Sequence, residues 1–269
     1  MTVVLLMLLC GRRSRTLATG RSLMVLAPHP DDETLGCGAI LARRYQGGGA
    51  VAVVVVTDGA GNPPGRDAGE LVRLRRAEVL TAMARLGIDE ADVRFLGLAD
   101  GALEGLHNDL VRLVSDLVAE LEPDDVLVTS AGESHADHAA LGRAARHACA
   151  GTQVRLWSYP IWQWQESRSL VRLVTPRCEY VATSAYREAK RRAIAAFATQ
   201  LGPVEDGGLP TGLLRACCGR WEFFHRIPCD LPRRGGSVAL IDHVARTDSL
   251  QRGSPVRSPA RVRRRPQQG

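Results

Sequence analysis

Short runs of apolar residues recur along the chain and predict buried β-strands. The run from Val51 to Val56 is β-branched except for Ala52, which is typical of a strand covered on both faces. Similar runs predict strands at residues 23–27, 51–57, 93–96, 126–129 and 154–157. The strands are therefore short and spread over more than half of the chain.

Stretches with helical spacing of apolar residues separate these strands. They predict helices at residues 33–46, 68–86, 108–121 and 135–149, and a later one at 186–201. Gly47-Gly48-Gly49 and Gly87 stand where the first two helices should stop. The alternation of strand and helix predicts an α/β fold with a doubly wound, mostly parallel, Rossmann-like sheet in a single domain.

The charge is unevenly distributed and suggests where that domain ends. Residues 231–269 contain nine Arg and two Asp, a charge of +7, so a total of +6 leaves −1 for the first 230 residues. We expect an N-terminal extension at 1–22, a catalytic domain at 23–230 and a basic, disordered tail at 231–269. The competing interpretation of the tail is contact with nucleic acid or anionic lipid, but we expect neither a nucleic-acid nor a membrane partner.

The cysteines and the N-terminus bear on the cellular compartment. Seven cysteines, an odd number without a CxxC pair, do not suggest a disulfide framework, so a reducing, cytoplasmic compartment is expected. Residues 2–10 are apolar but too few to span a bilayer, and no basic segment precedes them as in a secretory signal.

Two polar clusters follow predicted strands directly. His29, Asp31 and Asp32 come just after the strand at 23–27, and His135, Asp137 and His138 follow the strand at 126–129. Open α/β sheets bind ligands at the carboxyl ends of their strands. Imidazole and carboxylate groups are ligands of Zn²⁺, and a catalytic site keeps one position open for water. The two clusters together predict a zinc hydrolase.

Each cluster also has a simpler interpretation. Acidic residues at a helix start often cap the helix or interact with its dipole, and the second cluster could be a polar loop. Fe²⁺ would fit the same two-histidine, one-carboxylate set.

The sequence around these clusters resembles a known family, the PIG-L/LmbE-like zinc N-deacetylases. The resemblance rests on Ala27-Pro28-His29-Pro30-Asp31-Asp32-Glu33 and on His135-Ala136-Asp137-His138. Further similar segments are Thr57-Asp58-Gly59, residues 95–101 and residues 190–201. The resemblance implies a Rossmann-like fold and removal of an N-acetyl group from a glucosaminyl conjugate.

The residue chemistry and the resemblance suggest the same roles. His29, Asp32 and His138 are the expected zinc ligands, and Asp31, whose side chain diverges from that of Asp32, is the expected general base. His135 is expected to stabilise the oxyanion and protonate the leaving amine. Asp137 is expected to hydrogen-bond a histidine, with His135 as the first choice.

Substrate contacts are predicted at four further residues. Arg75 matches a position that resembles the family's substrate-contacting arginine, or it belongs to a solvated helix face. Asp100 either accepts sugar hydroxyls or serves only the turn with Gly101. Trp162 and Trp164 would stack on a sugar or an aromatic aglycone, although rings that plug the core are the alternative.

The predicted reaction is deacetylation of a small, soluble N-acetylglucosaminyl conjugate of mycothiol-type or antibiotic metabolism. An amidase for a different acyl group and a non-catalytic sugar-binding module are the alternatives. A homo-oligomer is compatible with the sequence. Glu133-Ser134 stands where some members of the family carry an aromatic hydroxyl beside the site, which would make the oxyanion depend more on Zn²⁺ and His135.

Overall fold

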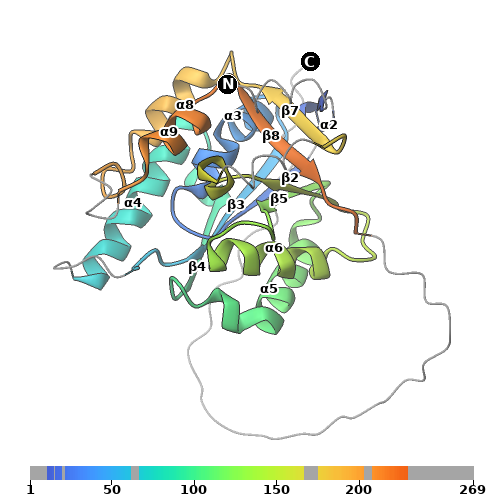
Figure 1. Ribbon diagram of the computed structural model, residues 1–269, viewed down its shortest axis with the longest axis horizontal. Helices are drawn as coiled ribbons and strands as arrows, with labels where there is room; N and C mark the ends of the chain where they lie inside the picture. The colour runs from blue at the N-terminus through green and yellow to red at the C-terminus, as the bar shows by residue number, and fades with distance from the viewer. Residues whose placement is uncertain are drawn as a thin grey trace, which may run out of the picture.

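The computed structural model describes residues 11–14, 16–19, 22–61, 67–166, 175–202 and 208–229. Within them, eight strands form one sheet in the order β1-β7-β8-β6-β5-β2-β3-β4 (Figure 1). The strands are β1 (Arg12–Arg13), β2 (Ser22–Ala27), β3 (Ala50–Thr57), β4 (Val93–Leu98), β5 (Asp125–Thr129), β6 (Arg155–Tyr159), β7 (Cys178–Ala182) and β8 (Trp221–Arg226).

Most neighbouring strands are parallel. The pairs β2–β3, β3–β4, β2–β5 and β5–β6 are parallel, and so is β1–β7. Only β8 runs the other way, antiparallel to β6 on one side and to β7 on the other. The chain proceeds from β2 outward to β4 and then returns to β5 on the opposite side of β2. This change of direction between β2 and β5 is the topological switch point at which open α/β sheets bind ligands.

Helices cover both faces of the sheet, because alternate strand residues point to opposite sides. Val25 and Val53 pack into one apolar cluster, and Met24 and Val54 into a second. The first cluster includes residues of α3 (Asp32–Gln46), α4 (Ala68–Leu86), α8 (Arg187–Ile194) and α9 (Thr211–Cys217), and α2 (Thr16–Thr19) adds Leu17. The second includes α5 (His107–Leu121) and α6 (Ala136–Ala148), so the fold has three layers, α/β/α (Figure 1).

The predicted fold class is confirmed, and the five predicted strands and first four helices agree with the structure to within a few residues. The last predicted helix, 186–201, is too long, because α8 ends at Ile194. Beyond it, Thr199 donates to Glu78 through its amide N and its hydroxyl, at 2.8 and 2.6 Å, and the Gln200 side chain donates to the Pro30 carbonyl. These contacts with distant residues replace the continuing helix.

Three short 3₁₀ helices complete the described elements: η1 (Glu90–Asp92), η2 (Leu103–Leu106) and η3 (Trp162–Gln165). Strands β7 and β8 and helix α9 were not predicted. No helix in the described ranges combines the length and apolarity needed to cross a membrane. The expectations for residues 1–10 and 231–269 fall outside the described part of the chain.

Candidate active site

The turn after β2 brings the first polar cluster to the switch point. Asp31 has φ 136°, a backbone conformation that L-residues rarely adopt, and its amide donates to the buried Glu33 carboxylate at 3.0 Å. The Asp31 carboxylate does not cap α3. Strain of this kind persists only where surrounding contacts enforce it, and it is found often at functional sites.

Three ligand atoms converge beside this turn. His29 Nδ1 lies 3.1 Å from His138 Nε2 and 3.3 Å from Asp32 Oδ2, and His138 Nε2 lies 3.2 Å from Asp32 Oδ2. His29 follows β2, and His138 lies in the first turn of α6 after β5. The two predicted clusters therefore meet, although 109 positions separate the two histidines.

This triangle fits a metal ion. Ligand atoms about 2.0–2.1 Å from a tetrahedral centre lie about 3.3 Å apart, close to the three separations observed here. The donor set, two imidazole nitrogens and one carboxylate oxygen, is suited to Zn²⁺ or Fe²⁺. His29, His135 and His138 also offer nitrogens within 4.8 Å of one another. The cluster can therefore hold a metal ion.

Two further carboxylates hold the other side of the His29 ring. Its Nε2 lies 3.2 Å from Asp137 Oδ2 and 3.0 Å from Asp100 Oδ1. Asp137 also accepts the amides of Gly101 and Leu103, at 2.7 and 3.0 Å. A carboxylate behind a ligating histidine fixes the tautomer and orientation of the ring.

These contacts correct the expected partner of Asp137. The sequence predicted His135 as its partner, but the Asp137 carboxylate contacts His29 instead. Asp137 lies in the first turn of α6, where its oxygens reach the His29 ring and the amides of Gly101 and Leu103, at the start of η2. Asp100 also contacts His29, and it accepts the Gly61 amide at 2.9 Å. The contact with His29 belongs to neither of the two roles that the sequence suggested for Asp100.

His135 lies next to the triangle formed by His29, Asp32 and His138. Its ring centroid is 4.6 Å from that of His29 and 4.9 Å from that of His138, and its buried Nδ1 has no hydrogen-bond partner. Trp162 stacks along it at 6.4 Å with an interplanar angle of 21°. An imidazole and an indole thus line one side of the site.

Glu133 fixes the turn that carries Trp162. Its carboxylate is buried and accepts the amides of Ile161 at 2.7 Å and Gln163 at 3.2 Å. Burial raises the pKa of Glu133 to about 7, although the positive charge of His138 and the two amides act in the opposite direction. The sequence singled out this position only as a departure from relatives and gave no hint of its contacts.

The surroundings of the two adjacent aspartates shift their pKa values in opposite directions. Burial, and then the charges of Asp32 and Glu33, raise the pKa of Asp31 well above its usual range. Burial would also raise the pKa of Asp32, but the charge and hydrogen bond of His138 and the contacts with His29 lower it strongly. The pKa values of the two neighbouring carboxyl groups are therefore shifted in opposite directions, a separation that is common among titratable groups at functional sites.

The pKa values of His29 and His135 are also shifted in opposite directions. Burial lowers the pKa of His29, but hydrogen bonds to Asp100, Asp137 and Asp32 outweigh it and raise the pKa well above 6.5. Burial and the charges of His29 and His138 lower the pKa of His135.

The remaining predicted residues lie at different distances from the cluster. Arg75 donates to the Gly59 carbonyl and lies 4.0 Å from Asp100 Oδ2, at the rim of the site. Trp164 instead packs against Phe223, with ring centroids 5.8 Å apart, and is half-buried against the core. Residues 62–66 fall outside the described residues.

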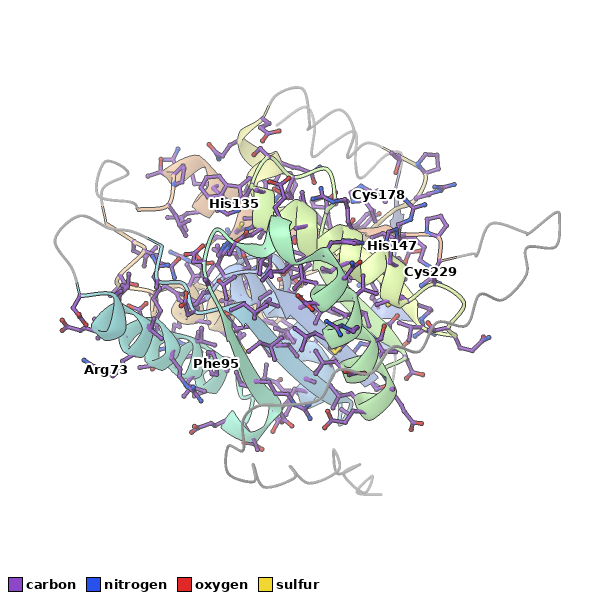
Figure 2. All side chains as sticks on the ribbon, turned by 90° about the horizontal axis from the view of Figure 1, so that it is seen from below. Arg73, Phe95, His135, His147, Cys178 and Cys229 are labelled. Carbon is purple, nitrogen blue, oxygen red and sulfur yellow. The ribbon has the colours of Figure 1, made fainter. Side chains whose placement is uncertain are left out.

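Two other histidines lie apart from the site. His107 and His147 contact each other through ring nitrogens 3.0 Å apart, where α5 meets α6. His135 and His147 lie toward opposite ends of α6 (Figure 2).

Comparison with known proteins shows which family and which relatives the chain is similar to. The family model "PIG-L: GlcNAc-PI de-N-acetylase" matches residues 24–149. The protein named "Uncharacterized deacetylase YaiS" of Escherichia coli is 31% identical over 134 residues, which cover 48% of this chain and 68% of that protein.

Two further relatives extend the comparison. A "1D-myo-inositol 2-acetamido-2-deoxy-alpha-D-glucopyranoside deacetylase" of Mycolicibacterium vanbaalenii is 32% identical over 179 residues, 56% of this chain and 61% of that protein. The solved "N,N'-diacetylchitobiose deacetylase from Pyrococcus horikoshii" superimposes with a TM-score of 0.61 at 19% identity, over 80% of this chain and 87% of that one. At that identity the superposition establishes a shared fold only.

Proposed function

Because this chain belongs to the PIG-L family of GlcNAc-PI de-N-acetylases, we propose that it hydrolyses the acetamide of an N-acetylglucosaminyl conjugate in a metal-dependent reaction. The products would be acetate and the free amine. The observation that carries this proposal is the triangle of His29 Nδ1, Asp32 Oδ2 and His138 Nε2, with separations of 3.1–3.3 Å. Those three residues would hold the ion, with Zn²⁺ as the first candidate.

A metal ion bound there would polarise the acetamide carbonyl and lower the pKa of a water molecule to about 7. Asp31 takes the proton of the attacking water, and its raised pKa suits a group that must accept and hold that proton. Asp137 and Asp100 keep the His29 ring oriented through its Nε2.

His135 acts on the other side of the acetamide. It donates a hydrogen bond to the carbonyl oxygen as negative charge develops there, and it delivers a proton to the departing amine nitrogen. The half-buried ring of Trp162 beside it would stack on a sugar ring or an aromatic aglycone. Arg75, at the rim, would contact polar groups of the acceptor.

The substrate class proposed is a soluble glycoside. The Mycolicibacterium relative named above supports a glucosaminyl-inositol acceptor. The tryptophan at the site supports an aromatic acceptor of the antibiotic type. An odd number of cysteines without a CxxC pair supports the proposed cytoplasmic location.

The test is acetate release from a panel of conjugates, with chelator and after restoration of metal. The panel contains N-acetylglucosaminyl-inositol, a simple N-acetylglucosaminide, a glycopeptide pseudoaglycone and an N-butyryl analogue of each. We expect chelator-sensitive acetate release, and the best acceptor identifies the substrate. Release from the butyryl series alone would indicate an amidase for another acyl group. A chain that binds one metal and hydrolyses none of these amides would contradict the proposal.

Matched variants separate the roles at the site. Asp31→Asn is expected to retain metal and lose about 10³-fold or more in turnover, in the range known for loss of a general base. His138→Asn is expected to lose the metal itself. Equal metal loss in both variants would contradict the division between base and ligand.

A further inference from the structure

The turn that carries Asp31 and Asp32 is held from both sides by side chains of one distant segment. Gln200 donates through Nε2 to the carbonyl of Pro30, just before the turn. Lys190 donates through Nζ to the carbonyl of Leu35, just after it, at 2.8 Å. Both side chains are almost completely buried. The two carbonyls that bracket the turn are therefore fixed by residues about 160 positions later in the chain.

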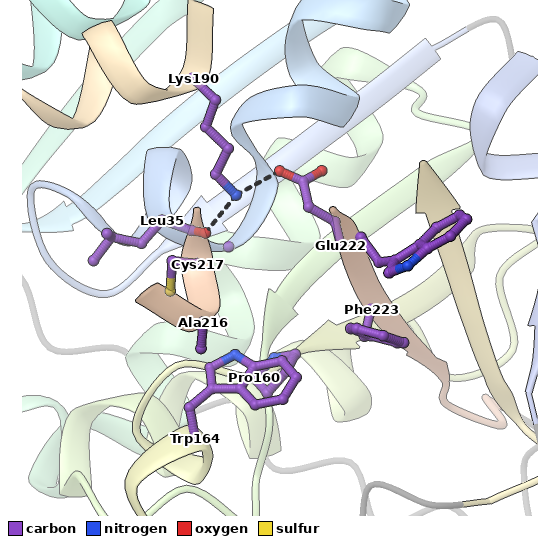
Figure 3. Close-up of a pocket in the computed structure, with 10 residues that line it drawn as sticks. Leu35, Pro160, Trp164, Lys190, Ala216, Cys217, Glu222 and Phe223 are labelled. Carbon is purple, nitrogen blue, oxygen red and sulfur yellow. Dashed lines mark hydrogen bonds and ion pairs between the residues drawn. The ribbon is translucent and has the colours of Figure 1, made fainter. Parts of the chain in front are cut away.

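Lys190 also forms a buried ion pair that contacts backbone groups of helix α3. Its Nζ lies 2.7 Å from Glu222 Oε1, and the Glu222 carboxylate accepts the amides of Ala39 and Ile40 at 2.7 and 2.9 Å. In an α-helix the Ala39 amide donates to the Leu35 carbonyl. Here that carbonyl accepts from the ammonium group of Lys190, which also contacts Glu222 (Figure 3). The Ala39 amide donates to the Glu222 carboxylate, so the ion pair contacts both backbone groups of this helical step, directly after the turn.

The sequence of α3 makes room for this contact. A Cβ atom on Gly38 would lie 3.0 Å from Cγ of Lys190, and one on Gly36 would lie 2.2 Å from Cδ2 of Tyr159. Any larger residue at Gly36 would displace the Tyr159 ring, whose hydroxyl donates to the Leu26 carbonyl at 2.9 Å at the end of β2. The two glycines therefore let the first turns of α3 pack closely against both side chains.

We propose that Lys190, Glu222 and Gln200 are positioning residues that hold Asp31 and Asp32 in the geometry needed for metal binding and proton transfer. This inference rests on the proposed function, because it takes Asp32 as a metal ligand. All three residues lie beyond the 24–149 segment that the family model matches. A buried ion pair is often no more stabilising than apolar residues of similar volume, so its presence is better explained by the geometry it imposes.

The other end of the same helix provides a matched control. Arg44 and Asp125 form a second buried ion pair, and Arg44 Nε donates to the carbonyl of Leu17. This pair also anchors α3, but it lies three turns beyond Asp32. Removing it should weaken the fold without altering the turn.

The experiment compares Lys190→Met with Arg44→Met in the full chain loaded with Co²⁺. The readouts are the rate of Co²⁺ loss to excess chelator, the visible absorption spectrum of the bound ion and the urea midpoint of unfolding. We expect Lys190→Met to lose Co²⁺ about 10-fold or more faster than wild type and to have an altered spectrum, as is usual when support of a ligand is lost. Arg44→Met should be destabilised similarly but keep the wild-type spectrum and a rate of Co²⁺ loss within about 3-fold of wild type.

Gln200→Ala provides a second variant, because it removes one hydrogen bond and no charge. It should also release Co²⁺ faster than wild type. The inference is overturned if Lys190→Met and Gln200→Ala keep the wild-type spectrum and rate of metal loss, or if Arg44→Met changes them equally. These readouts do not depend on hydrolysis. A wild-type chain that binds Co²⁺ but releases no acetate would count against the proposed function and leave this comparison intact.

Discussion

The substitution Glu133→Gln tests how Glu133 holds the turn that carries Trp162. The Glu133 carboxylate accepts two amides, those of Ile161 and Gln163, and burial raises its pKa from 4.5 to about 7. Glutamine has nearly the same shape but one acceptor oxygen, so one of the two amides loses its partner. A buried amide without a partner costs about 1–3 kcal/mol. This part of the effect does not depend on pH.

The second part depends on pH, and its sign follows from the raised pKa. Between pH 4.5 and 7 the folded protein binds a proton at Glu133 more tightly than the unfolded chain does. The stability that this proton contributes is complete below pH 4.5 and is lost as pH rises through 7. Raising the pKa of Glu133 from 4.5 to about 7 corresponds to about 3 kcal/mol of stability at low pH. The glutamine side chain of the variant cannot titrate, so the variant lacks this loss.

Plots of the free energy of unfolding against pH for wild type and Glu133→Gln are therefore expected to converge or cross. At pH 5 wild type should be more stable than Glu133→Gln by about 1–3 kcal/mol, and at pH 8 the difference should vanish or reverse. The measurement is urea unfolding of the metal-free proteins, with chelator present, at both pH values. Groups that do not interact with Glu133 titrate alike in both chains, and their contributions cancel in the difference. A stability difference that stays constant from pH 5 to pH 8 would refute the reasoning.

Three further outcomes follow from other contacts. Gly36→Ala should destabilise the protein by about 3 kcal/mol in urea unfolding, because its Cβ meets the Tyr159 ring at 2.2 Å, whereas Gly105→Ala, with no atom within 4 Å, should change stability by less than about 0.5 kcal/mol. Trp162→Ala should raise KM about tenfold through lost stacking, while Trp164→Ala should lower stability by about 2 kcal/mol and leave KM unchanged; the reverse pattern would exchange their roles. Chelation should lower the thermal midpoint, and Zn²⁺ at about 100-fold its Kd should restore about 2.7 kcal/mol, unless the metal binds the unfolded chain equally well.

The convergence of His29, Asp32 and His138 could be predicted because its signals are local. His29 and Asp32 follow an apolar strand directly, and His138 follows another, so the carboxyl ends of two parallel strands were enough to bring them together. Residue type then identified the chemistry. The partner of Asp137 could not be predicted in the same way, because its choice between His29 and His135 depends on where α6 begins and which amides of the η2 loop lie opposite.

The supporting contacts had no local signal at all. Trp221-Glu222-Phe223 has the alternation of a strand with a polar outer face, yet Glu222 is buried, because its partners are Lys190 and amides of α3 about 180 positions earlier. Glu133 is buried for a similar reason, since it binds amides of a turn 28 and 30 positions later. Sequence patterns report the average environment of a residue type, and a charged residue with distant buried partners departs from that average.

The location of β8 in the middle of the sheet has a consequence for how the protein is made. Its neighbour β6 ends at Tyr159 and β8 begins at Trp221, 62 positions later, whereas β2, β3 and β5 can pair as they emerge. At about 5–20 residues per second, translation of that interval takes about 3–12 seconds. Throughout that time β6 has an unpaired edge open to strands of neighbouring nascent chains, and the turn that carries Asp32 lacks Glu222. Strand β8, which is translated late, therefore both pairs with the open edge of β6 and supplies Glu222 to the turn.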